Sequence, residues 1–176
     1  MASIMDCVLR YLRDDKNWAI LLMGCTLLFL FADQNLLAPN LTACADDFGM
    51  SNSERDEKLG GEIALGFFLL GAPAAVAAGY LADVTHRIRL FGICTMFSGL
   101  ACLGTYFVQT FDQLLVFRTL TGVGIGAASP ITFSLMGDYF SQDTRIEVST
   151  FLGIMMSVGI SVGQLTSGLI GPVYRS

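Results

Sequence analysis

The sequence predicts an all-α membrane protein with about five transmembrane helices. Two observations support this fold class. Of the 176 residues, 53% are hydrophobic and only 14% are charged, whereas a soluble domain carries about 25% charged residues. In addition, five segments are apolar over roughly the 20 residues that a helix needs to cross the hydrocarbon core. Because lipid cannot satisfy exposed backbone groups, each of these segments is expected to be helical.

The expected helices follow one another closely and together form one partial domain, residues 18–171. They cover residues 18–41, 61–81, 90–108, 114–136 and 148–171. Residues 1–17 precede them as a tail, in which apolar positions recur at helical spacing over residues 4–12. This repeat predicts either a short helix on the membrane surface or an irregular tail. Before the second span, Ser53 and Asp56 have the spacing of a capping box, so that helix is expected to begin near residue 54.

Basic residues predict the orientation of the chain, because they are retained on the cytoplasmic side. With the N-terminus inside, the inner segments hold Arg10, Arg13, Lys16, Arg87, Arg89 and Arg145, and the outer segments hold only Arg55, Lys58 and Arg175. We therefore expect a multi-pass protein with a cytoplasmic N-terminus, in a membrane that the sequence does not specify. The net charge of −5 argues against nucleic acid as a partner.

Two predicted spans contain charged residues. Asp33, followed by Gln34 and Asn35, lies in the first span, and Arg118 lies in the fourth. A charge near the bilayer centre costs roughly 2.5–3.5 kcal/mol on insertion scales, so it normally faces a cavity or a partner. At 1.5 Å per residue, Asp33 and Arg118 lie about 12 and 9 Å from the outer ends of their helices. They are expected to pair or to share a cavity for substrate or proton. The alternatives are a purely stabilising ion pair, or charges that reach toward the membrane surface.

Glycines mark closely packed faces on the fourth and fifth spans, because helices in lipid associate through close backbone approach. The expected packing positions are Gly122, Gly124, Gly126, Gly159 and Gly163. Gly122-x-Gly124-x-x-Ala127 also fits a dinucleotide-binding pattern, but that pattern requires a preceding strand. No strand is predicted here, so no cofactor is expected.

No pattern in the sequence indicates an enzyme or a metal site. His86, the one histidine, lies in a predicted inner turn without clustered carboxylates or cysteines. The five cysteines, Cys102 among them, lack metal-type pairing and are interpreted as packing residues. No serine, cysteine and histidine arrangement resembles a catalytic set, although sequence spacing does not test a nucleophile assembled from distant segments.

The most specific motif lies between the second and third spans and reads Gly79-Tyr80-Leu81-Ala82-Asp83-Val84-Thr85-His86-Arg87-Ile88-Arg89. It resembles the signature loop of the major facilitator superfamily at Gly79, Leu81, Ala82, Asp83 and Arg87. Val84 and His86 stand where that family usually has a basic residue and a glycine. Further along, Arg118-x-x-x-Gly122-x-Gly124 resembles the family's fourth-helix motif, and Asp138 with Arg145 resembles the charged pair at the next inner turn.

Within that superfamily, Asp33 with Arg118 and the fourth-helix glycines is similar to the spinster-like lipid transporters, although Ile125 stands where that group carries a glutamate. The resemblance implies the N-terminal part of an alternating-access transporter, with the sixth helix and the C-terminal half missing. It implies a substrate or proton site at Asp33, Gln34, Asn35 and Arg118. It also implies a cytoplasmic gate formed by Gly79, Asp83, Arg87, Asp138 and Arg145.

Two functions are compatible with these features. The first is a transporter of a small organic or lipid-like solute, present here as a truncated half and linked to protons, since a buried carboxylate beside a water-filled path is a natural proton carrier. The second is a short, non-transporting membrane protein that associates with a full-length relative and modulates it. Membrane lipid surrounds the chain in both cases. Whether the reading frame continues beyond Ser176 distinguishes the two hypotheses.

Overall fold

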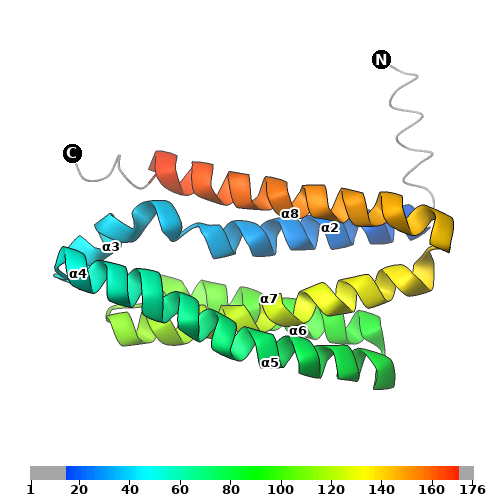
Figure 1. Ribbon diagram of the computed structural model, residues 1–176, viewed down its shortest axis with the longest axis horizontal. Coiled ribbons are helices and arrows are strands. Elements are labelled where there is room, and N and C mark those ends of the chain that lie inside the picture. Colours follow the sequence, from blue (N-terminus) through cyan, green and yellow to red (C-terminus); the bar gives the residue numbers. More distant parts are fainter. Residues whose placement is uncertain (1–14, 171–176) are drawn as a thin grey trace, which may run out of the picture.

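The computed structural model describes residues 15–170, which form helices and no strand. Five helical stretches in this range are long and apolar enough to cross a membrane, and they run side by side along one axis (Figure 1). The apolar repeat of residues 4–12 lies outside the described residues. The elements are α2 (Asp15–Asn35), η1 (Ala38–Asn40), α3 (Leu41–Asp47), α4 (Asn52–Glu54), η2 (Arg55–Glu62), α5 (Ile63–Val84), α6 (Arg87–Gly104), η3 (Thr105–Phe107), α7 (Phe111–Tyr139) and α8 (Gln142–Ile170).

The first helix ends earlier than the expected range of 18–41. α2 stops at Asn35, a 3-10 turn follows in η1, and the chain continues as the separate helix α3. Pro39 accounts for this break, because a helix running through it would lose a backbone hydrogen bond and press the proline ring against the Asn35 carbonyl. The helix that carries Asp33 therefore ends just two residues after that carboxylate.

The second helix begins earlier than expected, and the capping box predicted at Ser53 and Asp56 is wrong by two residues. Ser51 Oγ accepts a hydrogen bond from the Glu54 backbone N–H, and the Glu54 carboxylate accepts one from the Ser51 backbone N–H. The helix then continues without a break from α4 through the π-helical segment η2 into α5. α7 and α8 also begin before the expected residues 114 and 148, since helices extend from their apolar runs into polar first turns.

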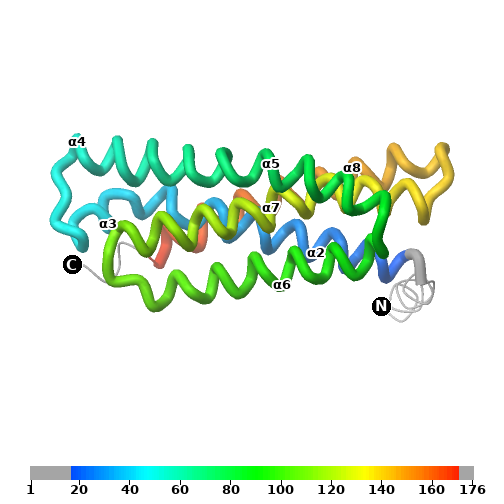
Figure 2. Tube along the Cα trace, turned by 90° about the horizontal axis from the view of Figure 1, so that it is seen from below, coloured from blue at the N-terminus to red at the C-terminus, as the bar shows by residue number. Residues whose placement is uncertain are grey.

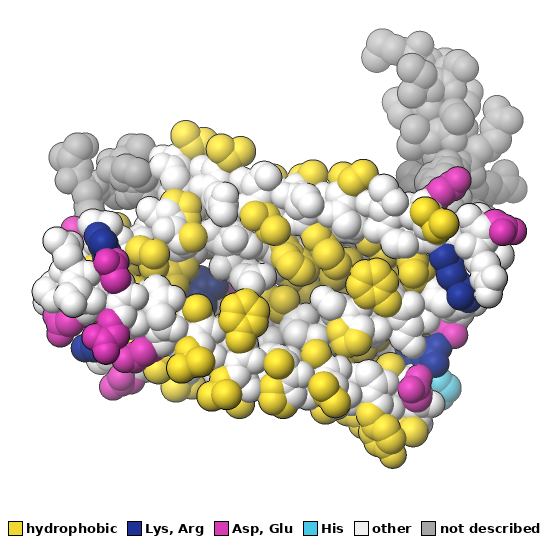
Figure 3. Space-filling model, viewed as in Figure 1, with side chains coloured by type: hydrophobic (Ala, Val, Ile, Leu, Met, Phe, Trp, Pro, Cys, Tyr) yellow, Lys and Arg dark blue, Asp and Glu magenta, His cyan; other side chains and the backbone are white. Residues whose placement is uncertain are grey.

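The five long helices form two groups (Figures 1 and 2). α2 packs against α8, and α7 packs against both α5 and α6. The main core joins the groups through fully buried side chains such as Leu27 of α2, Ile131 of α7 and Leu152 of α8. The outer faces of the helices expose many large apolar side chains (Figure 3). Such a continuous apolar surface is suited to contact with lipid.

Glycines bring the packed helices into contact. At all five expected packing positions, an added Cβ atom would collide with a neighbouring helix, and at four of them it would collide with that helix's backbone carbonyl group. The fifth, Gly124, would meet the Ser98 side chain. The contacts are Gly122 with Phe67, Gly124 with Ser98, Gly126 with Gly71, Gly159 with Leu28 and Gly163 with Ala32.

A second, smaller apolar cluster closes the end of the bundle where α3 lies, which we call the α3 end. Ala45 of α3, Leu59 of η2, Ile63 of α5 and Leu114 of α7 are buried together there. α3 therefore lies beyond the end of α2 and packs toward the ends of α5 and α7. These apolar side chains cover the end of the bundle next to Arg118.

Candidate functional site

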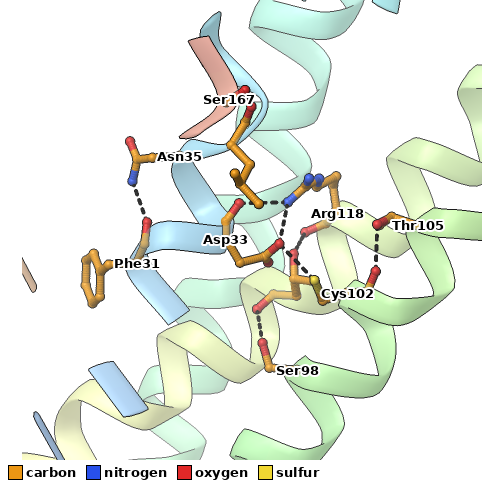
Figure 4. Close-up of polar contacts among 10 residues, drawn as sticks. Phe31, Asp33, Asn35, Ser98, Cys102, Thr105, Arg118 and Ser167 are labelled. Atoms are coloured by element: carbon orange, nitrogen blue, oxygen red, sulfur yellow. Dashed lines mark hydrogen bonds and ion pairs between the residues drawn. The ribbon is translucent and has the colours of Figure 1, made fainter. Parts of the chain in front are cut away.

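The two intramembrane charges lie against each other at the boundary between α2 and α7 (Figure 4). Arg118 Nη1 lies 3.4 Å from Asp33 Oδ1 and donates a hydrogen bond of 3.1 Å to the Asp33 carbonyl oxygen. The side chains of Arg118 and Asp33 are 11% and 14% exposed. The expectation that these two residues pair or share a cavity therefore corresponds to a direct, buried ion pair.

A cysteine thiol is the third member of this group. Cys102 Sγ, from α6, donates a hydrogen bond of 2.9 Å to Asp33 Oδ1, so the same carboxylate oxygen accepts from both Cys102 and Arg118 (Figure 4). No sequence signal pointed to Cys102, because its contact with Asp33 depends on how α6 is rotated in the bundle. The site thus joins three helices around one carboxylate.

The other two expected site residues lie differently. Gln34 lines the cavity beside Arg118. Asn35 instead donates from Nδ2 to the Phe31 carbonyl oxygen of its own helix, at 2.9 Å, and Figure 4 shows it on the side of α2 away from Arg118. The structure therefore brings Gln34 near the ion pair and leaves Asn35 outside it.

A cavity of about 210 Å³ opens next to Arg118, between α2, α5 and α7. Its polar lining comes from Gln34, Arg118 and Thr121, and most of the remainder is apolar, including Phe67 and Phe68 of α5. The face drawn in Figure 3 is hollowed between the two helix groups toward the α3 end, and basic atoms are visible inside the hollow. The cavity thus combines a buried cation with apolar walls.

A second hollow of about 530 Å³ lies between α2, α6 and α8. Asp33, Thr95, Ser98 and Cys102 supply polar groups to its otherwise largely apolar wall. Asp33 lines this hollow and Arg118 lines the first one, so the ion pair lies between the two spaces. Asp33 and Arg118 therefore line different cavities.

The expected gate residues gather at the opposite end of the bundle. Arg87, at the start of α6, lies 3.3 Å from Asp83 of α5 through Nη2 and pairs with Asp138 of α7 through Nη1. Its Nε also donates to the Ala82 carbonyl oxygen at 2.8 Å. Arg87 therefore ties the ends of three helices together. At Gly79, by contrast, an added Cβ atom would meet nothing within 4 Å among the described residues.

Arg145 does not pair with Asp138 in this structure. Its Nη2 donates to the Gly137 carbonyl oxygen at 2.8 Å, and its Nε donates to the Phe140 carbonyl oxygen at 3.1 Å. Both acceptors lie at the C-terminal end of α7, where carbonyl groups lack intrahelical partners and carry partial negative charge. The resemblance grouped Asp138 with Arg145. In the structure, Asp138 forms its ion pair with Arg87, and Arg145 caps the C-terminal end of α7.

Comparisons with known proteins agree with this architecture. Residues 23–175 match the Major Facilitator Superfamily. The 4-hydroxybenzoate transporter of Acinetobacter baylyi is 27% identical over 143 residues, which cover 81% of this chain and 30% of that relative. The niacin transporter of the same organism is 26% identical over 152 residues, which cover 86% and 34%. Multidrug resistance protein 3 of Bacillus subtilis is 34% identical over 94 residues, which cover 52% and 18%.

Among solved structures, the chain is similar to a bacterial homologue of the human lysosomal transporter spinster, in an inward-facing and unoccupied conformation. The TM-score is 0.75 with 21% identity, over 88% of this chain and 32% of that one, so the likeness shows a shared fold. The chain spans between 18% and 34% of the length of these relatives and of that structure. Since the family match covers most of the sequence and the fold agrees with it, this chain belongs to the Major Facilitator Superfamily and corresponds to its N-terminal part.

Proposed function

We propose that the chain forms part of the solute pathway of a transporter that works by alternating access. The observation that carries this proposal is the buried Asp33–Arg118 pair, which lies between two cavities at the boundary of two helix groups. Burying charge in a membrane protein is costly, and such groups usually serve a substrate or ion path. The relatives named as 4-hydroxybenzoate and niacin transporters favour a small organic solute over a lipid-like one.

Asp33 is the proposed carrier of a coupling proton. The charged and titratable side chains that contact its carboxylate are Arg118 from α7 and Cys102 from α6, within the described residues. Protonation of Asp33 removes the negative charge that holds Arg118, which weakens the link between α2 and α7. A proton thereby favours one arrangement of the two helix groups over another, as population shift requires.

Arg87 and its acidic partners are the proposed latch on the cytoplasmic side. The latch joins α5, α6 and α7 through side chains that are partly exposed to solvent. Because it lies at the opposite end of the bundle from the cavity beside Arg118, it influences which conformation is populated without touching solute. The basic residues near this end support a cytoplasmic position for the latch and for the N-terminus.

The pathway is expected to need helices beyond those described here. Alternating access requires two helical units that rock against each other, with the central site built from both, and this chain spans at most about a third of its relatives. In liposomes, the chain alone is therefore expected to show no saturable solute flux. Saturable flux that Asp33→Asn abolishes would contradict this expectation and indicate that copies of the chain assemble into a carrier.

The function itself is tested in a chimera in which residues 23–175 replace the matching part of the Acinetobacter baylyi 4-hydroxybenzoate transporter. We expect uptake of labelled 4-hydroxybenzoate that an inward proton gradient stimulates. Asp33→Asn should abolish this stimulation when uptake is divided by the amount of chimera in the membrane. Asp112→Asn, which changes an exposed carboxylate at the start of α7, is the matched control and should behave like the parent chimera. Gradient-stimulated uptake that persists in Asp33→Asn would refute the proposed role of Asp33.

A further inference from the structure

We propose that the cavity beside Arg118 binds the carboxylate group of a small solute with an apolar body. That the solute is then transported rests on the proposed function. The new element is the chemical class of the solute. It follows from three features: an Arg118 Nε–H donor without an acceptor, a cavity lining that is otherwise uncharged and a limited cavity volume. Each feature is an observation on this chain alone.

The first feature is a donor without an acceptor. An arginine carries five N–H donors in a planar fork. Both hydrogen bonds from Arg118 to Asp33 leave from Nη1, and Nε is buried with no hydrogen-bond partner among the described residues. Buried donors are nearly always satisfied in native proteins, so the orphaned Nε–H marks Arg118 as a group that can take a further acceptor. A guanidinium is well suited to bind a carboxylate, because it can form two parallel hydrogen bonds with it.

The second feature is the charge of the lining. Arg118, itself 9% exposed, is the one charged residue among those that line the cavity in the described part of the chain. Gln34 adds an amide that can donate a further hydrogen bond to an anion. The surrounding walls come from apolar side chains, including Ile63, Phe67 and Phe68. The cavity therefore offers one anion-binding corner and an apolar space for the rest of the molecule.

The third feature is size. The cavity measures about 210 Å³, below the roughly 300–1,000 Å³ typical of pockets for drug-sized ligands. A single aromatic or short aliphatic acid suits this volume better than a lipid with long chains. Benzoate combines one carboxylate with a compact apolar ring and is the probe that follows from these dimensions.

The test measures benzoate binding to the 176-residue chain in lipid nanodiscs by isothermal titration calorimetry. Benzamide, which has the same shape and no charge, is the matched ligand. Benzoate should bind roughly tenfold or more tightly than benzamide, because hydrogen bonds to charged groups are the strong ones. Arg118→Gln should lose benzoate binding by a similar factor, whereas Arg89→Gln, which removes an exposed arginine, should leave it unchanged.

A second variant keeps the test independent of the folding of Arg118→Gln. Ala64 lines the cavity, so Ala64→Phe fills the space and leaves Arg118 and Asp33 in the sequence, and it should abolish benzoate binding while the circular dichroism spectrum stays unchanged. Equal binding of benzoate and benzamide, benzoate binding that survives Ala64→Phe, or no benzoate binding at millimolar concentration would each overturn the proposal. None of these outcomes alters the Asp33-dependent uptake of the chimera, so failure here and failure of the proposed function are separable.

Discussion

Replacing Arg118 with glutamine should destabilise the helix bundle through the charge that it leaves on Asp33. Arg118 Nη1 lies 3.4 Å from Asp33 Oδ1, and both side chains are largely buried. At an effective dielectric constant of about 20, unit charges at this distance attract each other by about 5 kcal/mol. The remaining donor, the Cys102 thiol, is a weak one. Because breaking a buried ion pair by removing one partner costs about 3–5 kcal/mol, we expect Arg118→Gln to lower the free energy of unfolding by that amount.

The assay is reversible unfolding of the 176-residue chain in mixed micelles by titration with dodecyl sulfate, followed by far-ultraviolet circular dichroism. The control is the double variant Asp33→Asn with Arg118→Gln, which leaves no unpaired charge and should recover most of the loss. The difference between single and double variants measures the coupling of the two residues. A single variant within about 1 kcal/mol of the parent chain, or a double variant as unstable as the single one, would refute the reasoning.

Three further perturbations test other parts of the structure. Gly163→Leu places side-chain atoms against a backbone carbonyl of α2 and should cost about 1–3 kcal/mol of unfolding free energy in the same titration. Gly153→Leu, on the same helix at a position with open space, should change it by less than about 0.5 kcal/mol, and equal effects would contradict the packing shown here. Ser51→Ala removes the helix cap and should cost about 1 kcal/mol, visible as faster hydrogen exchange at the Glu54 amide; unchanged exchange would count against the cap. Arg87→Ala breaks two partly exposed ion pairs that contribute little to stability, and in the chimera it should lower the maximal uptake rate with little change in KM. A large change in KM at an unaltered maximal rate would contradict a latch.

The sequence was sufficient to predict five apolar spans and the proximity of the two intramembrane charges. Apolar runs of sufficient length can only be helices in lipid, and the rise per residue of a helix is fixed. Asp33 and Arg118 were therefore expected at similar depths, and the structure places them in direct contact. The glycine spacing likewise predicted close helix packing, because only glycine lets two backbones approach so closely. These features depend on geometry that every α-helix shares.

Features that depend on helix rotation or on breaks in a helix were not predictable from spacing. Asn35 was grouped with the site because it lies two residues after Asp33. Two residues correspond to about 200° around a helix, and the Asn35 side chain bonds back to its own helix. Cys102 lies far from Asp33 in sequence, and only the packing of α6 brings them together. The separate helix α3 was missed because the predicted span was carried through Pro39 to residue 41, although proline is a signal for the end of a helix.

The glycine contacts also determine how the bundle can move. Gly159 and Gly163 lie one turn apart on α8 and press on the carbonyls of Leu28 and Ala32, one turn apart on α2. Each glycine leaves a gap that a carbonyl group of α2 occupies. These two contacts are expected to oppose sliding by less than the 5.4 Å pitch of a helix. Gly122 and Gly126 bear on α5 in the same way. We therefore expect each pair of helices to resist sliding along its axis, and relative displacement to concentrate where α2 meets α7. The Asp33–Arg118 pair lies across that boundary. A change in the charge of Asp33 is therefore expected to act directly on the contact between the two groups of helices.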